Sequence, residues 1–238
     1  MPTIAAPSFL GPVRRRIGAA CLLAGPLCFA AVELVWPETG SSAEDVLRSV
    51  AAARPSMPAA LGLMLATSLL FVPGVFAMLS RPLPRGRALC DTGLGLALWS
   101  FLTDAALVGV NTVFVAMTDP AVDHRAMVQL LGALMASPVA MVLLSGHWVL
   151  VVAFLLLGAG LWRAGLWRAG VGPRWAAAAI GLCGVADLAL SPLGEMSSIV
   201  SDLLMLAGFG AQAWLLLRED HPEESRAATS GAEEPLQA

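Results

Sequence analysis

Two ionisable residues lie deep inside apolar stretches of this chain and are its first candidates for chemistry. Asp104 stands near the middle of the apolar run 92–116, and His147 lies about nine residues into the run 138–162. About 20 helical residues cross a hydrocarbon layer roughly 30 Å thick, so both side chains are expected near its midplane. An unpaired charge there costs several kcal/mol, so each group should be neutral, paired or facing a wet cavity. The two residues predict either acid–base chemistry or an Asp–His pair that only holds two helices together.

Other polar residues gather in the halves of the apolar runs that are predicted to face outward. Asn111 shares a helix face with Asp104 and lies nearer the outside. Glu33, Asp187 and Asp202 occupy the outer halves of three further runs, and the inner halves carry almost no such groups. We therefore expect a polar chamber open toward the outer face. For Glu33 and Asp202 the alternative is a carboxylate solvated at headgroup depth.

Aromatic residues in the same runs add a second kind of contact. Trp99, Phe114, Trp148 and Phe209 could flank a cation, because aromatic faces attract positive charge. Ordinary packing within a helical bundle is the alternative role of these rings. The candidate residues are Asp104, Glu33 and His147 for acid–base catalysis, and Asn111, Asp187, Asp202, Trp99 and Trp148 for ligand binding.

These residues need a scaffold of membrane-spanning helices. Of the 238 residues, 58% are hydrophobic and only 13% are charged, and the mean hydropathy is +0.77, a composition typical of membrane proteins. Six runs have membrane-spanning length, at residues 17–36, 58–80, 92–116, 138–162, 175–192 and 197–217. We therefore predict an all-α fold, a polytopic bundle of six transmembrane helices, in which residues 17–218 form one domain.

The distribution of arginine predicts how this bundle is oriented. All fourteen basic residues are arginine, and cytoplasmic loops retain positive charge. With the N-terminus inside, eleven arginines are cytoplasmic and three are external. Residues 1–16 are then a cytoplasmic segment, and the acidic residues 219–238 a disordered cytoplasmic tail, of a multi-pass plasma-membrane protein. The first run is too long for the hydrophobic region of a signal peptide and lacks an A-x-A site, so we expect an uncleaved span.

Both predicted outer loops contain a signal for the start of a helix. In residues 37–57 one of two adjacent serines, Ser41 or Ser42, is followed three residues later by an acid and then by an apolar stripe. In the second outer loop Asp119 is the predicted N-cap, with a proline in the first turn. We expect two short helices on the outer surface, which either roof the bundle or lie in the membrane interface.

Several classes of site and partner are excluded by what the sequence lacks. A haem held between helices needs two embedded histidines, and His124 and His221 lie in predicted loops. The sequence contains no H-E-x-x-H motif, no Gly-rich phosphate loop and no G-x-S-x-G nucleophile elbow, and its four cysteines form no C-x-x-C pair. The net charge of -3 offers no basic face for nucleic acid. We predict no cofactor and no metal site.

Several local motifs are similar to those of known groups of membrane proteins. Over roughly residues 12–218 they are E-L-V-W-P at 33–37, S-S-A-E-D at 41–45, L-L-F-V-P-G-V at 69–75 and G-L-W-R-A-G-V-G-P-R-W-A-A-A at 165–178. On these motifs the chain resembles uncharacterised actinobacterial six-helix integral membrane proteins, a domain-of-unknown-function family, which implies the bundle but no activity. A-V-E-L-V-W at 31–36 also resembles the acid-bearing helix of small integral-membrane terpene cyclases. That likeness implies an acid at Glu33 that protonates an epoxide or alkene.

Two functional hypotheses follow. In the first, a non-catalytic bundle in the lipid bilayer binds or moves a lipid or a small hydrophobic or cationic molecule, which the chamber carboxylates contact. In the second, a membrane-embedded enzyme acts on an isoprenoid or acyl substrate, with Asp104 or Glu33 as the acid and His147 as its partner or base. No internal repeat supports a transporter built from two related halves. A third hypothesis, a signalling or immunity protein that acts through protein contacts, depends only on the acidic tail, and the sequence predicts no oligomeric state.

Overall fold

The computed structural model shows a protein built from helices. It describes residues 11–37, 40, 42–81, 83, 85–164, 173–190 and 195–218. Within these ranges there are eight helices and no strand, and five of the helices are long and apolar enough to cross a membrane. The prediction of an all-helical protein is confirmed for these residues, and the five apolar helices are consistent with the membrane class.

The helices begin and end close to the predicted boundaries. α4 begins before the predicted residue 92, because its first turn is polar: Arg87 Nε lies 2.8 Å from a carboxylate oxygen of Asp91, one turn further on. An apolar run therefore predicts which part of a helix can lie in lipid, but it does not predict where the helix begins or ends. The bounds are α1 Pro12–Val35, α2 Ala43–Ala52, α3 Met57–Leu79, α4 Arg87–Met117, α5 His124–Met135, α6 Pro138–Arg163, α7 Arg174–Leu190 and α8 Glu195–Arg218.

The structure has five helices that meet the length and hydropathy of a membrane span, where the sequence predicted six. The five are α1, α3, α4, α6 and α8. α7 has 17 residues, which correspond to about 26 Å of rise and fall short of a hydrocarbon layer roughly 30 Å thick. The predicted run 175–192 extends past the end of α7 at Leu190, because hydropathy alone does not register where a helix stops.

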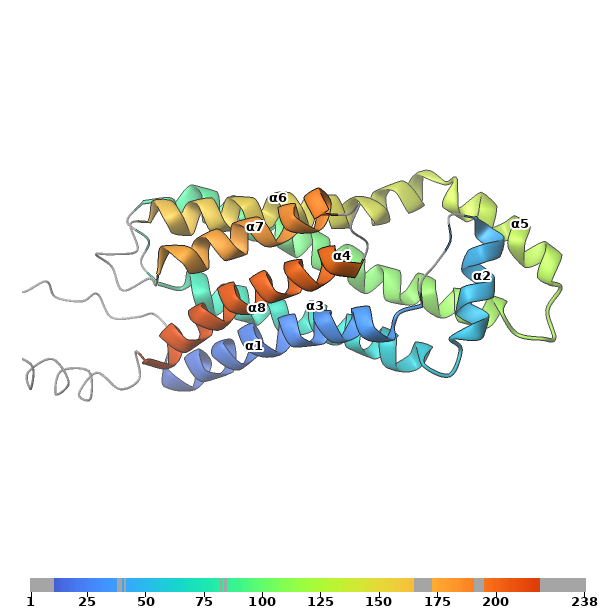
Figure 1. Ribbon diagram of the computed structural model, residues 1–238, viewed down its shortest axis with the longest axis horizontal. Coiled ribbons are helices and arrows are strands. Elements are labelled where there is room, and N and C mark those ends of the chain that lie inside the picture. Colours follow the sequence, from blue (N-terminus) through green and yellow to red (C-terminus); the bar gives the residue numbers. More distant parts are fainter. Residues whose placement is uncertain are drawn as a thin grey trace, which may run out of the picture.

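The long helices run along one axis (Figure 1), and their contacts close a ring of α1, α3, α4, α6, α7 and α8. α1 packs on α3, α3 on α4, α4 on α6, α6 on α7 and α7 on α8, and α8 closes the ring on α1. The start of α1 and the end of α8 lie at the same end of the ring (Figure 1). We call the half of the ring at that end the terminal half, and the opposite half, next to α2 and α5, the distal half.

Four phenylalanines from four helices form the centre of the core. Phe71 of α3 stacks on Phe101 of α4, with ring centroids 5.0 Å apart, and meets Phe209 of α8 edge-on at 5.3 Å. Phe154 of α6 lies 5.5 Å from Phe209, also edge-on. All four side chains are buried, with 0 to 4% of their surface exposed. Because these rings sit near mid-helix, they separate the terminal half from the distal half.

The terminal half is held together by close backbone packing. A Cβ added to Gly158 of α6 would lie 2.6 Å from the carbonyl oxygen of Ala177 and from Cα of Gly181, both on α7. Membrane helices gain most from such small residues, since lipid offers little hydrophobic drive and close van der Waals contact replaces it. At the end of this half, Arg81 is 3% exposed and donates from Nη1 to Oε1 of the buried Gln212, at 3.4 Å.

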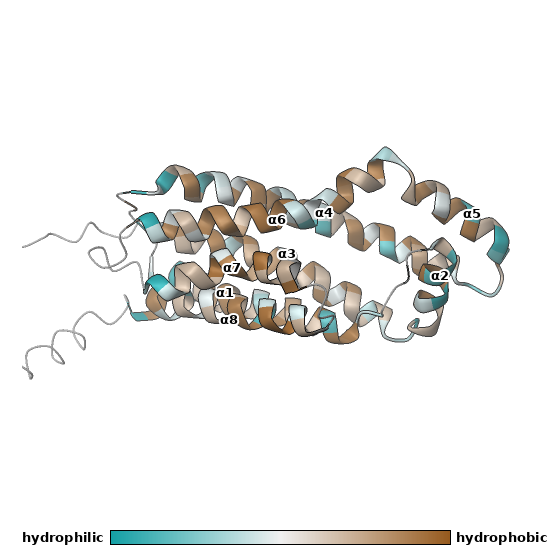
Figure 2. Ribbon diagram, turned by 45° about the horizontal axis from the view of Figure 1, so that its top comes forward, coloured by the Kyte–Doolittle hydropathy of each residue, from teal (hydrophilic) through white to brown (hydrophobic). Residues whose placement is uncertain are grey.

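α2 and α5 lie together at the distal end (Figure 1). Leu47 of α2 and Leu131 of α5 are buried against Met117, the last residue of α4, in a small cluster separate from the main core. The hydropathy colouring shows the long helices as largely apolar and the polar residues of the described chain as concentrated toward the ends (Figure 2). The two predicted short helices therefore exist, and they pack on each other and on the end of α4.

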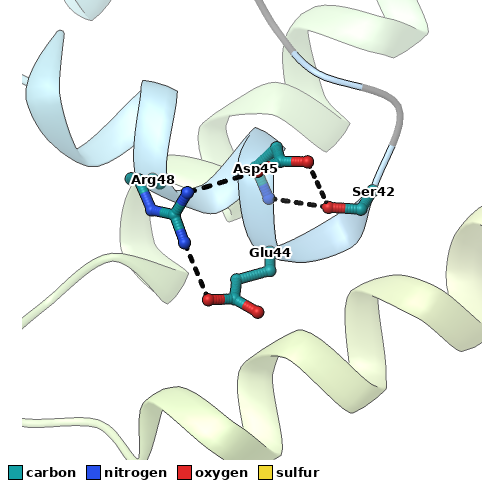
Figure 3. Close-up of polar contacts among 4 residues, drawn as sticks. All are labelled: Ser42, Glu44, Asp45 and Arg48. Carbon is teal, nitrogen blue, oxygen red and sulfur yellow. Dashed lines mark hydrogen bonds and ion pairs between the residues drawn. The ribbon is translucent and has the colours of Figure 1, made fainter.

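α2 begins at one of the two predicted serines. Ser42 Oγ accepts a hydrogen bond from the Asp45 backbone N–H at 3.1 Å and donates to the Asp45 carboxylate at 2.5 Å (Figure 3). Arg48 pairs with Glu44 at 2.8 Å and with Asp45 at 3.3 Å, one turn along the same helix (Figure 3). The acids near the start of α2 also suit the positive end of the helix dipole.

The predicted N-cap of the second short helix was wrong by one turn. α5 begins at His124, and the Asp123 side chain accepts from the backbone N–H groups of Arg125 and Ala126. Asp119 instead closes a turn before the helix, where its Oδ1 accepts from the Ala121 N–H at 2.9 Å. Its Oδ2 also accepts from Arg54 at 3.0 Å, which ties this turn to the connection between α2 and α3.

Candidate functional site

A cavity of about 290 Å³ lies within the ring, mainly in its distal half. All six ring helices contribute to its lining, chiefly with their middle turns and with the turns nearer to α2 and α5. The lining mixes charged, hydroxyl, apolar and aromatic side chains. The floor toward the terminal half includes Phe154, which belongs to the aromatic core.

Three carboxylates and one imidazole line this cavity. They are Glu33 of α1, Asp104 of α4, His147 of α6 and Asp202 of α8. Glu33 and His147 are exposed, whereas Asp104 and Asp202 are half-buried, so the ionisable lining extends from an accessible mouth into the interior. Four of the residues predicted from depth alone thus lie around one space, on four different helices.

Asp104 and His147 come together because α4 and α6 pack closely at their level. A Cβ added to Gly146 of α6 would overlap the Oγ1 of Thr103 on α4. Asp104 and His147 are the next residues along these two helices, and they interact electrostatically across the cavity lining. An acid and an imidazole on facing helices can stabilise each other's charge and can exchange a proton with a molecule held between them.

Hydroxyl groups line the other side of the cavity. Ser198 and Ser201 of α8 both contribute to the lining, and Ser201 Oγ donates to the backbone carbonyl oxygen of Cys183 on α7 at 2.9 Å. This hydrogen bond joins α7 to α8 beside Asp202. The contact between Ser201 and α7 depends on how the two helices pack, which depth along the chain does not give.

Two hydroxyls of α3 line the cavity without having been predicted. Thr67 and Ser68 are both 5% exposed, and each donates to a carbonyl oxygen one turn earlier, Leu63 at 2.9 Å and Met64 at 3.3 Å. Their own helix thus occupies their donor groups, while their oxygens remain able to accept. Two adjacent hydroxyls in an otherwise apolar run were the available sequence signal.

A stripe on α1 supplies much of the remaining surface. Phe29, Val32, Glu33 and Trp36 follow the i, i+3, i+4, i+7 spacing of one helix face, and all four line the cavity. Phe154 adds a third aromatic ring from α6. The sequence analysis singled out Glu33 alone, although this periodicity could have identified its aromatic neighbours as well.

Some predicted residues lie elsewhere. Trp99 and Trp148 are 46% and 61% exposed and do not belong to the cavity lining, although the Trp148 ring meets the His147 ring edge-on at 6.2 Å. Asn111 is half-buried and lies two turns beyond Asp104, outside the lining. Successive helix residues differ by about 100° in direction, so correct depth did not assure the correct face. The side chain of Asp187 lies outside the described residues.

Neither a metal cluster among the described residues nor a match to a known protein points to a function for this cavity. Across the described ranges no group of three or more His, Cys, Asp or Glu side chains is arranged to hold a metal ion. No protein-family model matches the sequence, and no curated protein and no solved structure matches it either. The resemblances stated from local motifs therefore stay predictions.

Proposed function

We propose that the chain is a multi-pass plasma-membrane protein with six crossings, whose distal half faces outward. Among the described residues nine arginines lie at the terminal end of the ring and three lie near α2 and α5, which favours a cytoplasmic terminal end. α7 serves as the sixth crossing in this proposal because it packs between α6 and α8 along the same axis (Figure 1). α2 and α5 then lie at the outer surface.

Aromatic and arginine side chains at the terminal end support this orientation. The Arg174 guanidinium lies 5.6 Å from the centre of the Trp162 ring, and that of Arg218 lies 3.9 Å from the Trp214 ring. Trp and Arg side chains of this kind suit the level of lipid headgroups, where a ring and a charge are both accommodated.

We further propose that the distal cavity binds or moves a small hydrophobic molecule that carries positive charge. One observation supports this function above all: three carboxylates, with one imidazole, line a single cavity whose other walls are largely apolar and aromatic. Carboxylates in such a space are stabilised by a cation, and aromatic faces such as Phe29 and Trp36 attract the same cation. The three carboxylates would repel an apolar anion.

The cavity volume limits the size of this molecule. At roughly 30 Å³ for each non-hydrogen atom, the share of a water molecule in the liquid, a cavity of about 290 Å³ holds about ten such atoms. A quaternary ammonium ion with one small apolar substituent meets the size, the charge and the apolar surface together. A complete phospholipid is too large, although its headgroup could enter.

Binding of benzyltrimethylammonium to the purified protein tests this proposal. Its uncharged counterpart of the same shape, neopentylbenzene, serves as the control ligand, and calorimetric titration in detergent measures both. We expect saturable binding of the cation, weaker binding of the neutral molecule, and a loss of about ten-fold in cation affinity in Asp104→Asn, as one charge-assisted contact supplies about that much.

A matched variant separates the cavity from general surface charge. Glu44→Gln removes one exposed carboxylate at the same end of the protein without touching the cavity lining, so its affinity should equal that of the unchanged protein. Equal binding of the charged and neutral ligands, or an equal effect of Asp104→Asn and Glu44→Gln, would contradict a cation site at this cavity.

A membrane-embedded enzyme on an isoprenoid-type substrate is the second candidate. The electrostatic interaction between Asp104 and His147 favours it, because an acid and a base then lie beside a cavity that also contains Phe29, Trp36 and Phe154. In this function Asp104 or Glu33 protonates the substrate, and the rings stabilise a carbocation. Incubating membranes with a short polyprenyl epoxide tests it: a cyclised product that disappears in Asp104→Asn or Glu33→Gln supports the enzyme, and no product in any sample excludes it for this substrate.

A further inference from the structure

A second cavity, of about 460 Å³, lies at the terminal end of the ring, far along the helices from the first. Residues of the first turns of α1, the last turns of α3 and the beginning of α4 line it. None of its lining residues lines the cavity of the proposed cation site. Its lining changes from charged to apolar along the helix axis, and that order decides what it can bind.

The mouth of this cavity is basic. Arg14 and Arg87 both line it, together with the Ser80 hydroxyl at the end of α3. Arg87 donates from Nη1 to the Leu79 carbonyl oxygen at 3.2 Å and from Nε to the Asp91 carboxylate at 2.9 Å, which holds its guanidinium at this rim, and its side chain remains 54% exposed. Arg14 is exposed and makes no hydrogen bond or ion pair with the residues that the structure describes.

Deeper along the helices the lining becomes apolar. Ile17 lies almost one turn beyond Arg14 on α1, and Leu94 lies two turns beyond Arg87 on α4, which is about 10 Å further toward mid-bilayer. Phe76 of α3 completes this surface. Ile17 and Phe76 are 55% and 50% exposed, so the protein leaves these apolar side chains uncovered below its own basic rim.

The floor of the cavity is rigid. Gly18 of α1 is buried there, and a Cβ added to it would overlap the Cβ of Ala77 on α3. α1 and α3 thus touch along their backbones, so the cavity is a groove over a closed seam and not a passage into the bundle. What occupies it must come from the lipid side.

We infer that this groove holds one anionic phospholipid, with its phosphate at Arg14 and Arg87 and an acyl chain along Ile17, Phe76 and Leu94. The two guanidinium groups complement a phosphate, which arginine binds through paired N–H donors. The apolar wall of about 10 Å complements the upper part of an acyl chain. Basic pockets between membrane helices recognise anionic headgroups for this reason, and a soluble phosphate would leave the apolar wall exposed to water.

Native mass spectrometry of the purified full-length protein with defined lipids tests this inference. We expect retained phosphatidylglycerol and little retained phosphatidylcholine, because only the former carries a net negative charge. Arg14→Gln with Arg87→Gln should lower phosphatidylglycerol affinity by roughly 25-fold, since each arginine near an anionic lipid contributes about five-fold. The double variant Arg85→Gln with Arg163→Gln removes the same charge at the same end, outside the groove lining, and should keep most of the affinity.

A variant in the apolar part of the groove and a competition with a soluble phosphate test the inference further. Leu94→Trp fills the apolar part of the groove without changing its charge and should also reduce retention, which covers the case in which loss of the contacts of Arg87 disturbs folding. Glycerol phosphate added in excess should not displace the lipid. Equal retention by the two double variants, displacement by glycerol phosphate, or unchanged retention in Leu94→Trp would each overturn a phospholipid site at this groove.

Discussion

The same six helices pack differently in the terminal and distal halves of the ring. In the terminal half Gly158 brings α6 and α7 into backbone contact, and the groove at that end lies over the closed contact between α1 and α3. In the distal half Glu33, Asp104 and Asp202 line a cavity together with His147. The phenylalanine core lies between the two.

This difference shows how a small membrane protein can keep polar groups at depth. Carboxylates inside a bilayer destabilise a bundle unless they are paired or solvated, so they need helices that stay in place without their help. Close contacts in the terminal half supply that stability, because van der Waals packing is the main attraction between helices in lipid. We therefore expect substitutions in the terminal half to change stability, and those in the distal half to change binding.

The largest effect should follow from filling a close backbone contact of the terminal half. Gly158→Leu places four carbon atoms where even one would lie 2.6 Å from the backbone of α7, so the two helices must separate. Overpacking typically costs about 1–3 kcal/mol and occasionally more, and rigid backbone on the other side favours the upper end. Thermal unfolding in detergent measures it. Gly95→Leu is the control, because nothing lies within 4 Å of a Cβ at that position.

A smaller loss should follow from opening the aromatic core. Phe71 is 1% exposed and contacts three other phenylalanine rings, so Phe71→Ala leaves a hole that its neighbours fill only in part. We expect about 2 kcal/mol of lost stability, measured by the same unfolding, which is below the usual range for such changes because lipid removes most of the transfer contribution. Phe76→Ala, at a ring 50% exposed, should change stability much less. Equal losses would contradict a core centred on Phe71.

A modest effect should follow from removing the hydrogen bond between Ser201 of α8 and Cys183 of α7 beside the cavity. Ser201→Ala deletes the donor to the Cys183 carbonyl oxygen and changes little volume. Hydrogen bonds between membrane helices contribute about 0.6 kcal/mol on average, so stability should fall by about that amount. Binding of benzyltrimethylammonium should stay within a factor of about two in the same variant. A loss of several kcal/mol would mean that the distal half carries stability after all.

The smallest effect should come from Asp119, outside the membrane-spanning helices. The Ala121 backbone N–H, and then the Arg54 side chain, stabilise its carboxylate and hold its pKa below the ordinary value. A lowered pKa means that the stabilisation is present above the unfolded pKa of about 3.9 and is lost as the pH falls through the folded value. Asp119→Asn should therefore lower the unfolding temperature slightly at pH 7, with the difference from the unchanged protein shrinking below about pH 4.

The dependence on salt tests whether Asp119→Asn acts by removing the charge of the carboxylate. Both side chains of the Arg54 and Asp119 pair are about two-fifths exposed, at 42% and 45%, so added salt should screen their attraction at pH 7. A difference that persists unchanged at pH 3 or in concentrated salt would show that the asparagine acts through the turn itself and not through the charge.

Much of the fold could be predicted because hydrophobic run length is a direct consequence of the membrane. The boundaries of α3 and α6 were predicted to within one residue, and Ser42 was among the expected caps of α2. The start of α5 was missed because both Asp119 and Asp123 are good capping residues, and only the packing of Leu131 against Leu47 and Met117 decides between them. The run that contains α7 was predicted to end at residue 192, two residues beyond Leu190, because hydropathy alone does not show where a helix stops.

The sequence predicted how deep each site residue lies along its helix, but it did not predict which residues face the cavity. Asp104 and His147 were identified from their distance along two antiparallel helices, whereas Trp99 and Trp148, chosen because aromatic rings attract cations, lie outside the cavity lining. The rotation of each helix about its axis follows from contacts such as Gly146 against Thr103, which join residues about 40 positions apart. No local pattern contains that information.

By itself the sequence determined the membrane class, the positions of the long helices and the depth of each ionisable group, because length, hydropathy and rise per residue are local quantities. The tertiary structure alone decided that α8 closes the ring on α1, which acids share a cavity, and that Arg14 and Arg87 line one groove with apolar residues. Those facts depend on which helix faces touch, and helices choose their faces by packing against one another.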